Sequence, residues 1–370
     1  MEKTKIELQS QKQDEALASI GDEHNVGIAI GTGGGKTLLG LKHMAKQYHD
    51  SISFLVAAPT KSIFIEWTNQ AMQHGLEFLL PHITFTTYRS LPKQRVDYDW
   101  LYLDECHSLK HSHSEYLDEL NSKGGKILGL SGTYPAYASS EKGVMCNQYC
   151  RKIFEYNIDE AIEDGMLNNY TIYVHMLKLS NFHTVEKKTK TGTFKTSEVK
   201  DQAYYDSAIT RASSDFMKQR LIIGRMKSLQ SYQTKVDYIK KILPNIPYKV
   251  LVFANTKKQA DEISKYSYHS SNKNSEHNLQ LFADNKIKEL SCVDQLSEGK
   301  NIPNLRAGII MHTFSNERKL RQKVGRFLRL NPDESATIHV LCYEDSVDLR
   351  WVQNSLKYFD ADKIKTYRPQ

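Results

Sequence analysis

The stretch "VGIAIGTGGGKTLLG" (residues 26–40) places an apolar run, a glycine-rich turn and a Lys-Thr pair in direct succession. Glycine costs conformational entropy in a helix or strand, so this run is expected where the backbone must wrap closely around another group. Residues 26–30 predict a buried strand, and the apolar periodicity of residues 38–45 predicts a helix. A strand, a glycine turn and a helix in this order form the setting in which backbone N–H groups bind a phosphate.

Short apolar, β-rich runs recur along the whole chain, with helical stretches between them. They lie at residues 26–30, 52–58, 83–88, 100–104 and 126–132, and again at 171–179, 249–254, 287–293, 307–313 and 337–343. This alternation predicts an α/β protein with two parallel sheets, one after the other, each covered by helices. Residues 137–167, between the two series, show few strand signals. We therefore expect one domain over 1–160 and a second over 161–370, with a cleft between them.

The length and composition are those of a globular protein. At 370 residues the chain is long enough for two domains with separate cores. No window holds the roughly 20 apolar residues of a membrane-spanning helix. The polar first 20 residues are unlike a secretory signal. We expect a cytoplasmic protein that has no membrane partner and is monomeric on its own.

The five cysteines are few and scattered, as is typical of a protein from a reducing compartment. They are Cys106, Cys146, Cys150, Cys292 and Cys342. Two groups leave a zinc site open, the pair Cys146 and Cys150 and the histidines between positions 107 and 113. Neither group has the paired spacing of a known ligand set, so unliganded side chains are the favoured interpretation.

The net charge of +7 is unevenly distributed along the chain. Residues 1–165 carry 16 Lys and Arg against 22 Asp and Glu, whereas residues 166–370 carry 34 against 21. A chance asymmetry of a solvated surface is one interpretation. The other is a second half that faces a polyanion such as nucleic acid.

The glycine loop and the two residues after it have the chemistry of a triphosphate site. We expect Lys36 to reach the β- and γ-phosphates of ATP and the Thr37 hydroxyl to bind Mg²⁺. The strict pattern G-x-x-x-x-G-K-T is not met, because Ile30 stands where the first glycine belongs. A glycine turn without a ligand therefore stays open on this stretch alone.

The stretch "LYLDECHSL" (residues 101–109) adds two acids at the end of an apolar strand. We expect Asp104 to bind Mg²⁺, partly through water, and Glu105 to act as general base toward the attacking water. A solvated acid pair at a strand end is the alternative. It is the weaker interpretation here, because a glycine-lysine-threonine loop precedes this pair with strands between.

These residues resemble the motifs of superfamily 2 helicases, the DExD/H-box motors. "GTGGGKT" (31–37) looks like motif I and "DECH" (104–107) like motif II. The further motifs stand in the expected order: the upstream glutamine element at Gln13, motif Ia at 58–67, Ib at 84–91, III at 130–135, IV at 250–263, V at 296–305 and VI at 322–329. The resemblance implies two RecA-like domains with an ATP cleft between them.

The resemblance also implies which residues of the first domain and of motif V bind the nucleotide. Gln13 would read the adenine. The loop residues that would hold the phosphates are Gly31, Thr32, Gly33, Gly34 and Gly35. Gly299 and Asn301 of motif V would complete the site from the second domain.

Motif VI, "QKVGRFLR", would supply Gln322, Arg326 and Arg329 to catalysis. In related phosphoryl-transfer systems, guanidinium groups that neutralise charge on the γ-phosphate accelerate the reaction by about 10³–10⁵. Because they would come from the second domain, domain closure would be tied to hydrolysis. The alternative for residues 316–330 is a basic amphipathic helix on a solvated or nucleic-acid surface.

A nucleic-acid strand would lie across both domains, held mainly by its phosphates. The resemblance points to motifs Ia, Ib and IV, with Pro59, Thr60, Lys61, Thr87, Arg89, Asn255, Thr256 and Lys257. For each of these residues alone, a plain surface role is as good an interpretation. Ser131 and Thr133 of motif III would couple the nucleotide site to movement, in which ATP draws the domains together and hydrolysis lets them part.

Two features favour DNA over RNA. Residues 154–179 resemble the linker of DNA-directed members, among them restriction-enzyme motor subunits and phage branch-migration helicases. Asn301 stands where RNA-directed DEAD-box members have aspartate. We therefore expect an ATP-dependent helicase or translocase that acts on single-stranded or branched DNA. An RNA helicase, or a nucleotide-gated clamp that binds nucleic acid without unwinding it, is the alternative.

The polar segment 181–202 interrupts the α/β pattern and is rich in lysine. Its plain interpretation is a solvated loop or an exposed hairpin around residues 191–192. The alternative is a hairpin that separates strands or grips a duplex, because lysines neutralise phosphates.

Overall fold

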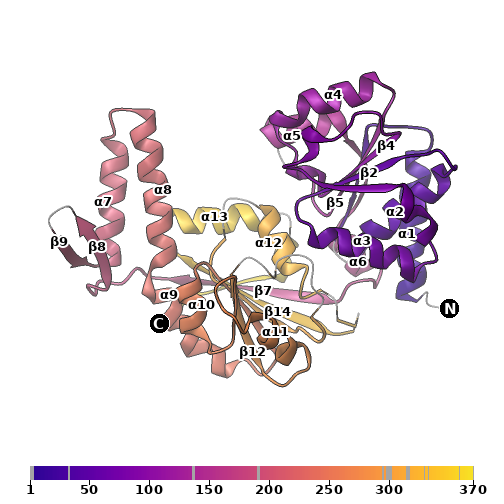
Figure 1. Ribbon diagram of the computed structural model, residues 1–370. Helices are drawn as coiled ribbons and strands as arrows, with labels where there is room; N and C mark the ends of the chain where they lie inside the picture. Colours follow the sequence, from indigo (N-terminus) through magenta and orange to yellow (C-terminus); the bar gives the residue numbers. More distant parts are fainter. Residues whose placement is uncertain are drawn as a thin grey trace. The chain divides into compact units, whose positions relative to one another are not determined.

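The chain folds into two units, each built on its own sheet. The computed structural model describes residues 4–31, 34–135, 138–189, 192–293, 296, 302–313, 317–328, 330–331, 333–357 and 359–369. The first unit is Met1–Leu167 and the second is Asn168–Gln370 (Figure 1). Residues 161–167, which we expected in the second domain, lie in the first unit. There the Met166 and Leu167 N–H groups donate to the Ala161 carbonyl of α6 (Ile158–Glu163).

Six parallel strands form the sheet of the first unit. They are β1 (Val26–Ile30), β2 (Phe54–Ala58), β3 (Ile83–Thr87), β4 (Trp100–Asp104), β5 (Lys126–Ser131) and β6 (Arg151–Tyr156). Their order is β3-β2-β4-β5-β1-β6. Every residue of β1, β2 and β4 is buried, as expected for parallel strands that are covered on both faces.

Helices supply the crossovers that parallel strands require. In the first unit they are α1 (Lys5–Ile20), α2 (Lys36–Gln47), α3 (Ser62–Gln73), α4 (Ser114–Ser122), α5 (Glu141–Tyr149) and α6, with 3-10 turns η1 (Glu77–His82), η2 (Leu91–Lys93), η3 (Cys106–Ser108) and η4 (His111–His113). Because the strands all run in one direction, the segments that follow β1 to β5 meet at one edge of the sheet. This carboxyl edge carries the motif residues of the first unit.

Seven parallel strands form the sheet of the second unit, in the order β11-β12-β10-β13-β14-β7-β15. They are β7 (Asn169–Leu177), β10 (Val250–Ala254), β11 (Ser267–Tyr268), β12 (Glu289–Val293), β13 (Ala307–Ile310), β14 (Ser335–Tyr343) and β15 (Ile364–Tyr367). Its helices are α9 (Gln233–Ile242), α10 (Lys257–Ile263), α11 (Ser275–Ala283), α12 (Glu317–Val324) and α13 (Val347–Leu356), with 3-10 turns η5 (Leu243–Asn245) and η7 (Ala361–Lys363).

Four further elements stand between β7 and α9 in the chain. The strands β8 (Val185–Thr189) and β9 (Gly192–Thr196) form a two-stranded antiparallel hairpin. The helices α7 (Glu198–Thr210) and α8 (Asp215–Ser231) follow and run side by side (Figure 1). Of the two plain interpretations of residues 181–202, the hairpin is therefore correct, although residues 190–191 at its turn lie outside the described residues.

The expected fold class, α/β with two tandem parallel sheets, is confirmed. All ten strands that the apolar runs predict are present. The interpretation of residues 137–167 as poor in strands is wrong in one place, because β6 pairs with β1 at the edge of the first sheet. An edge strand exposes one face and one side, so its sequence "RKIFEY" lacks the continuous apolar run of a central strand.

A buried ion pair fastens α9 to the second sheet. Lys235 is fully buried, and its Nζ lies 2.6 Å from Asp348 Oδ2 at the start of α13. The same ammonium donates to the carbonyls of Met311 and Leu341, at 2.9 and 3.0 Å. Asp348 Oδ2 also accepts from the Tyr343 N–H group. One buried charge pair therefore links α9 and α13 to the ends of β13 and β14.

Membrane-spanning helices can be assessed among the described residues. None of the helices among them is both long enough and apolar enough to cross a bilayer.

We expect Lys235→Ala to lower the free energy of unfolding by about 3–5 kcal/mol, because it leaves the Asp348 carboxylate buried without its cation. Urea unfolding followed by circular dichroism measures this change. Lys241→Ala, on the exposed end of the same helix region, is the control and should change it by less than about 0.5 kcal/mol. Equal effects of the two substitutions would contradict the role given to the buried pair.

Candidate functional site

The glycine loop after β1 has the backbone that a phosphate cradle needs. Gly35 caps α2 in the left-handed conformation, with φ of 72°. A Cβ at Gly34 would lie 1.9 Å from Ile30 Cγ2, so no other residue fits there. The Gly34 N–H group donates to the Gly31 carbonyl at 3.2 Å, which closes the turn. Lys36 and Thr37 then begin α2, whereas Thr32 and Gly33 lie outside the described residues.

Gln13 of α1 lies against this loop. Its side chain is buried, and its Nε2 donates to the carbonyls of Gly34 and Gly35, each at 3.2 Å. Its Oε1 has no hydrogen-bond partner among the described residues. A buried acceptor without a donor is costly, so this atom suits a ligand that brings an N–H group to the loop. The sequence prediction that Gln13 belongs to the nucleotide site is compatible with this placement and stays a prediction.

An ion pair joins the loop lysine to the second acid of "DECH". Lys36 Nζ lies 2.7 Å from Glu105 Oε1, and both side chains are largely buried. Glu105 Oε2 lies 3.3 Å from His107 Nδ1 and accepts from Ser131 Oγ at 3.4 Å. Glu105 also has φ of 54°, a left-handed conformation that costs a residue with a Cβ of order 1 kcal/mol or more. Such strain is found at functional sites, where the surrounding structure maintains it.

The end of β5 completes this network. Ser131 Oγ lies 2.7 Å from His107 Nδ1 and accepts from the Thr133 N–H group at 3.1 Å. A Cβ on Gly132 would lie 3.2 Å from Lys36 Nζ, which is tighter than ordinary contact. Alanine, which the resembling motif has at this position, would therefore need a small shift of the end of the lysine side chain. The structure thus brings motifs I, II and III together at the carboxyl edge of the first sheet.

Asp104 is held by a residue that the sequence analysis missed. It is buried, and its Oδ2 accepts from Trp67 Nε1 of α3 at 2.8 Å. Its backbone carbonyl accepts from the Tyr88 hydroxyl at 2.9 Å. The pKa of Asp104 is raised to about 6, mainly by burial and then by the neighbouring Glu105 carboxylate, against the opposing effect of Lys36. Trp67 is the last residue of the motif Ia stretch. Its only signal in the sequence is that a large aromatic residue closes this stretch.

Core packing positions motif VI in the second unit. Phe327 is fully buried and fills the space over Gly308 of β13, where a Cβ would lie 2.1 Å from its Cζ. The buried Asn168 holds the same segment, because its Nδ2 donates to the Phe327 carbonyl and its Oδ1 accepts from the Leu330 N–H group. Arg326 is largely buried just after α12, and Gln322 is half-buried on it. Arg329 lies outside the described residues.

The expected nucleic-acid residues of the first unit lie together. Residues 59–61 follow β2 and residues 87–89 follow β3, and these strands are neighbours with Ala58 opposite Thr87. The Tyr88 N–H group donates to the Ala58 carbonyl at 3.2 Å, which joins the two segments beyond the sheet. The side chains of Thr60, Lys61 and Arg89 are exposed, and those of Pro59 and Thr87 are half-buried. All five therefore stand at the same edge as the Lys36–Glu105 pair.

In the second unit, Asn255, Thr256 and Lys257 follow β10. Asn255 donates to Gln230 Oε1 at 3.1 Å, and Thr256 caps α10 by accepting from the Gln259 N–H group. Lys257 is exposed. Thr256 therefore has a structural role that is independent of any ligand. Gly299 and Asn301 of motif V lie outside the described residues.

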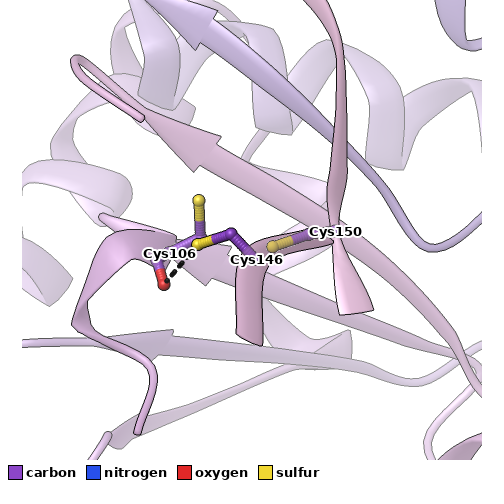
Figure 2. Close-up of side chains that lie close together, drawn as sticks. All are labelled: Cys106, Cys146 and Cys150. Carbon is purple, nitrogen blue, oxygen red and sulfur yellow. Dashed lines mark hydrogen bonds between the residues drawn. The ribbon is translucent and has the colours of Figure 1, made fainter. Parts of the chain in front are cut away.

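Three cysteines from distant parts of the chain meet in the core of the first unit (Figure 2). The Sγ atoms of Cys106, Cys146 and Cys150 lie within 4.8 Å of one another, and all three residues are buried. Cys146 Sγ donates to the Cys106 carbonyl, and burial raises the pKa of the Cys106 thiol well above its usual range. Both facts favour protonated, packed thiols. The zinc alternative had grouped Cys146 with Cys150 but had not joined Cys106 to them.

Comparison with known proteins finds a family match in the second unit, over the segment that contains motifs IV to VI. Residues 234–331 match the family described as the helicase conserved C-terminal domain. That range includes Asn255, Lys257, Gln322 and Arg326. The DNA 3'-5' translocase XPB2 of Sulfurisphaera tokodaii is 22% identical to this chain over an alignment of 370 residues. The alignment covers 92% of this chain and 82% of XPB2.

Two solved structures share the fold. The type ISP restriction-modification enzyme LlaBIII bound to DNA has a TM-score of 0.63 at 14% identity, and the match covers 98% of this chain but only 31% of the LlaBIII chain. Mss116p bound to ssRNA and AMP-PNP has a TM-score of 0.57 at 16% identity, with 98% of this chain and 74% of Mss116p covered.

Asp104 yields a prediction about stability and pH. Its folded pKa of about 6 lies above the ordinary value of 3.8, so the fold carries an unfavourable carboxylate above pH 6. We expect Asp104→Asn to stabilise the ligand-free protein at pH 8 by about 1–3 kcal/mol, and this gain to vanish as the pH falls through 6 toward 4. Thermal unfolding at several pH values measures it, with Asp22→Asn at an exposed site as the control. A gain that does not depend on pH would refute the assignment.

Proposed function

We propose that the chain is an ATP-driven DNA helicase or translocase, because residues 234–331 match the helicase conserved C-terminal domain and the chain is similar to a DNA translocase over most of its length. The observation that carries the proposal is the ion pair between Lys36 and Glu105, with Ser131 and His107 on the same carboxylate. Through Glu105 it joins the loop lysine of motif I to the acid of motif II and to Ser131 of motif III. A glycine turn without a ligand would not require a buried lysine and a strained glutamate beside it.

The ion pair suggests how the triphosphate triggers catalysis. Lys36 Nζ now neutralises Glu105, and a triphosphate on the loop would draw the ammonium to its β- and γ-phosphates. Glu105, released from its cation, then accepts a proton from the attacking water as general base. His107 and Ser131 keep its second oxygen oriented. Gln13, with its unpartnered buried Oε1, adds a site for the base of the nucleotide.

The residues present fit a magnesium ion beside the loop. Thr37 and Asp104 would hold it, since a hydroxyl and a carboxylate are ligands that Mg²⁺ accepts. When bound, the ion would neutralise charge on the β- and γ-phosphates. Trp67 already donates to Asp104 Oδ2, so that carboxylate has its other oxygen left for the ion or its waters.

The second unit would contribute Gln322, Arg326 and Arg329 to the γ-phosphate. Packing of Phe327 against Gly308 fixes the backbone from which Arg326 extends. We propose that the two units close on the nucleotide, and that Ser131 and Thr133 pass this closure to the nucleic-acid track. Thr32, Gly33, Gly299 and Asn301 complete the nucleotide site in this proposal, on the resemblance alone.

The nucleic-acid track would run along the exposed residues after β2, β3 and β10. Hydroxyls, an amide and cations at Thr60, Lys61, Arg89, Asn255 and Lys257 suit phosphate contacts without reading of bases. DNA is favoured by the match to a DNA translocase over nearly the whole of this chain. Single-stranded or branched DNA is the form we propose.

We expect Glu105→Gln to bind ATP with affinity near that of the unmodified protein but to lose at least about 100-fold in hydrolysis, because an amide cannot accept the proton of the attacking water. Phosphate release and binding of a fluorescent ATP analogue measure the two properties. Glu115→Gln, at an exposed site on α4, is the matched control and should hydrolyse normally. Normal turnover in Glu105→Gln would remove the general base from the proposal.

A panel of nucleic acids tests the substrate. ATP hydrolysis should rise several-fold with single-stranded and branched DNA and less with RNA of the same sequence. Displacement of a labelled strand, or of a bound protein, should depend on ATP. Stimulation by RNA alone would replace DNA by RNA in the proposal, and hydrolysis without any movement along a strand would favour a clamp.

A further inference from the structure

The segment between β7 and α9, residues 181–231, forms an arm on the second unit. It contains β8, β9, α7 and α8, and the two helices end away from the seven-stranded sheet (Figure 1). Neither β8 nor β9 joins that sheet, since they pair only with each other among the described strands. The α/β core is complete without the arm, so the arm needs an explanation of its own.

Buried acids fasten the base of the arm. Asp201 is almost fully buried, lies 2.7 Å from Lys187 Nζ of β8, and accepts from the Ser228 and Tyr232 hydroxyls. Glu198 is fully buried and accepts from Ser180 N–H and from the N–H and hydroxyl groups of Thr234. Buried carboxylates with this many donors hold one geometry, because any opening leaves a charge unpaired. The arm is therefore set rigidly on the second unit.

The arm carries a large share of the positive charge of the chain. Residues 181–231 hold ten Lys and Arg against five Asp and Glu, in a protein whose net charge is +7. At the base, Lys187 is paired with Asp201 and Arg225 with Asp206. Among the described residues of the arm, the exposed cations outside any ion pair are Lys195, Lys200, Arg211, Lys218, Arg220 and Lys227. The uncompensated charge thus faces solvent.

The tip of the arm, residues 211–220, combines these cations with exposed apolar side chains. Every residue from Ser213 to Arg220 is exposed. Phe216 is 72% exposed and Met217 48%, and the Arg220 guanidinium lies 5.8 Å from the centre of the Phe216 ring. An exposed tip with a ring, a thioether and flanking cations offers no groove that could enclose an extended strand. It can meet a flat apolar face that is bordered by anions.

We propose that this tip contacts the end of a nucleic-acid duplex, at the junction between paired and unpaired strands. The terminal base pair offers a flat face to Phe216 and Met217, as apolar side chains do when they contact exposed base steps. Lys218 and Arg220 neutralise the phosphates on either side. The proposal rests on the proposed function and assigns to it a contact outside the helicase motifs.

Other partners fit the observations less well. A single strand would need a groove along which its phosphates run, whereas every residue from Ser213 to Arg220 is exposed. An anionic lipid surface could take the same cations and ring, but the match of residues 234–331 to a helicase domain favours nucleic acid. The arm's excess of cations over acids favours the polyanion that the motor itself would track.

The test compares substrates and variants. Lys218→Gln with Arg220→Gln removes two tip cations, and Lys241→Gln with Lys286→Gln removes two exposed lysines from segments that precede β10 and β12. Fluorescence anisotropy measures binding to a forked duplex and to a single strand of equal length. We expect the tip pair to bind the fork about 5–10-fold more weakly, with a log–log salt slope shallower by about two. Single-strand binding and single-strand-stimulated hydrolysis should stay unchanged.

Phe216→Ala separates the ring from the charges. We expect it to weaken fork binding about 3–10-fold without changing the salt slope, whereas Phe78→Ala, an exposed phenylalanine of the first unit, should leave fork binding unchanged. Equal losses on fork and single strand, equal losses in tip and control variants, or a loss confined to anionic vesicles would each overturn the tip proposal. If the unmodified protein neither hydrolyses ATP nor binds any nucleic acid, the proposed function itself fails instead.

Discussion

The contact between Lys36 and Glu105 is the constraint on which the first unit depends. Two residues 69 positions apart in the chain meet at 2.7 Å because β1 and β4 deliver them to the same edge of one parallel sheet. Glu105 reaches it only in a left-handed backbone conformation, and Gly132 leaves the room in which the lysine lies. A charge pair in partly dry surroundings is strong yet exchangeable, so a more highly charged phosphate can replace the carboxylate. In the proposed function, a bound triphosphate would take the place of the carboxylate beside Lys36.

The carboxyl edge of each sheet carries short segments that hold the candidate site residues, whereas the strands beneath them are buried. In the first unit Trp67 and Tyr88 link this edge to the core by holding Asp104. In the second unit Asn168 and Phe327 do the same for motif VI. Positioning residues of this kind are buried hydrogen-bond donors and rings, which no motif pattern contains. The candidate site residues of both units are therefore held in place by side chains that look like ordinary core.

The arm shows a second way to position charge. Its base uses Asp201 and Glu198 to fasten two helices and a hairpin, and its tip leaves cations and a phenylalanine in solvent. Both helices lack a single apolar face, so their sequence gives no sign of which side packs. The lysine-rich stretch 187–200 pointed to nucleic acid, but the tip lies further along, where Arg211, Lys218 and Arg220 flank Phe216 and Met217.

Local pattern determined much of this protein. Apolar runs predicted the ten main strands, because a parallel strand buried on both faces must be continuously apolar. The glycine loop, the acid pair and the arginine motif predicted the residues of the candidate site, because these motifs are defined by residue types and by their order in the sequence. Tertiary structure decided the rest. Strand order placed Lys36, Ser131 and His107 around the one carboxylate of Glu105. It also brought Cys106 to Cys146 and Cys150, added β6 at an edge, and set Trp67 on Asp104. These contacts join distant positions through packing, and no local pattern encodes them.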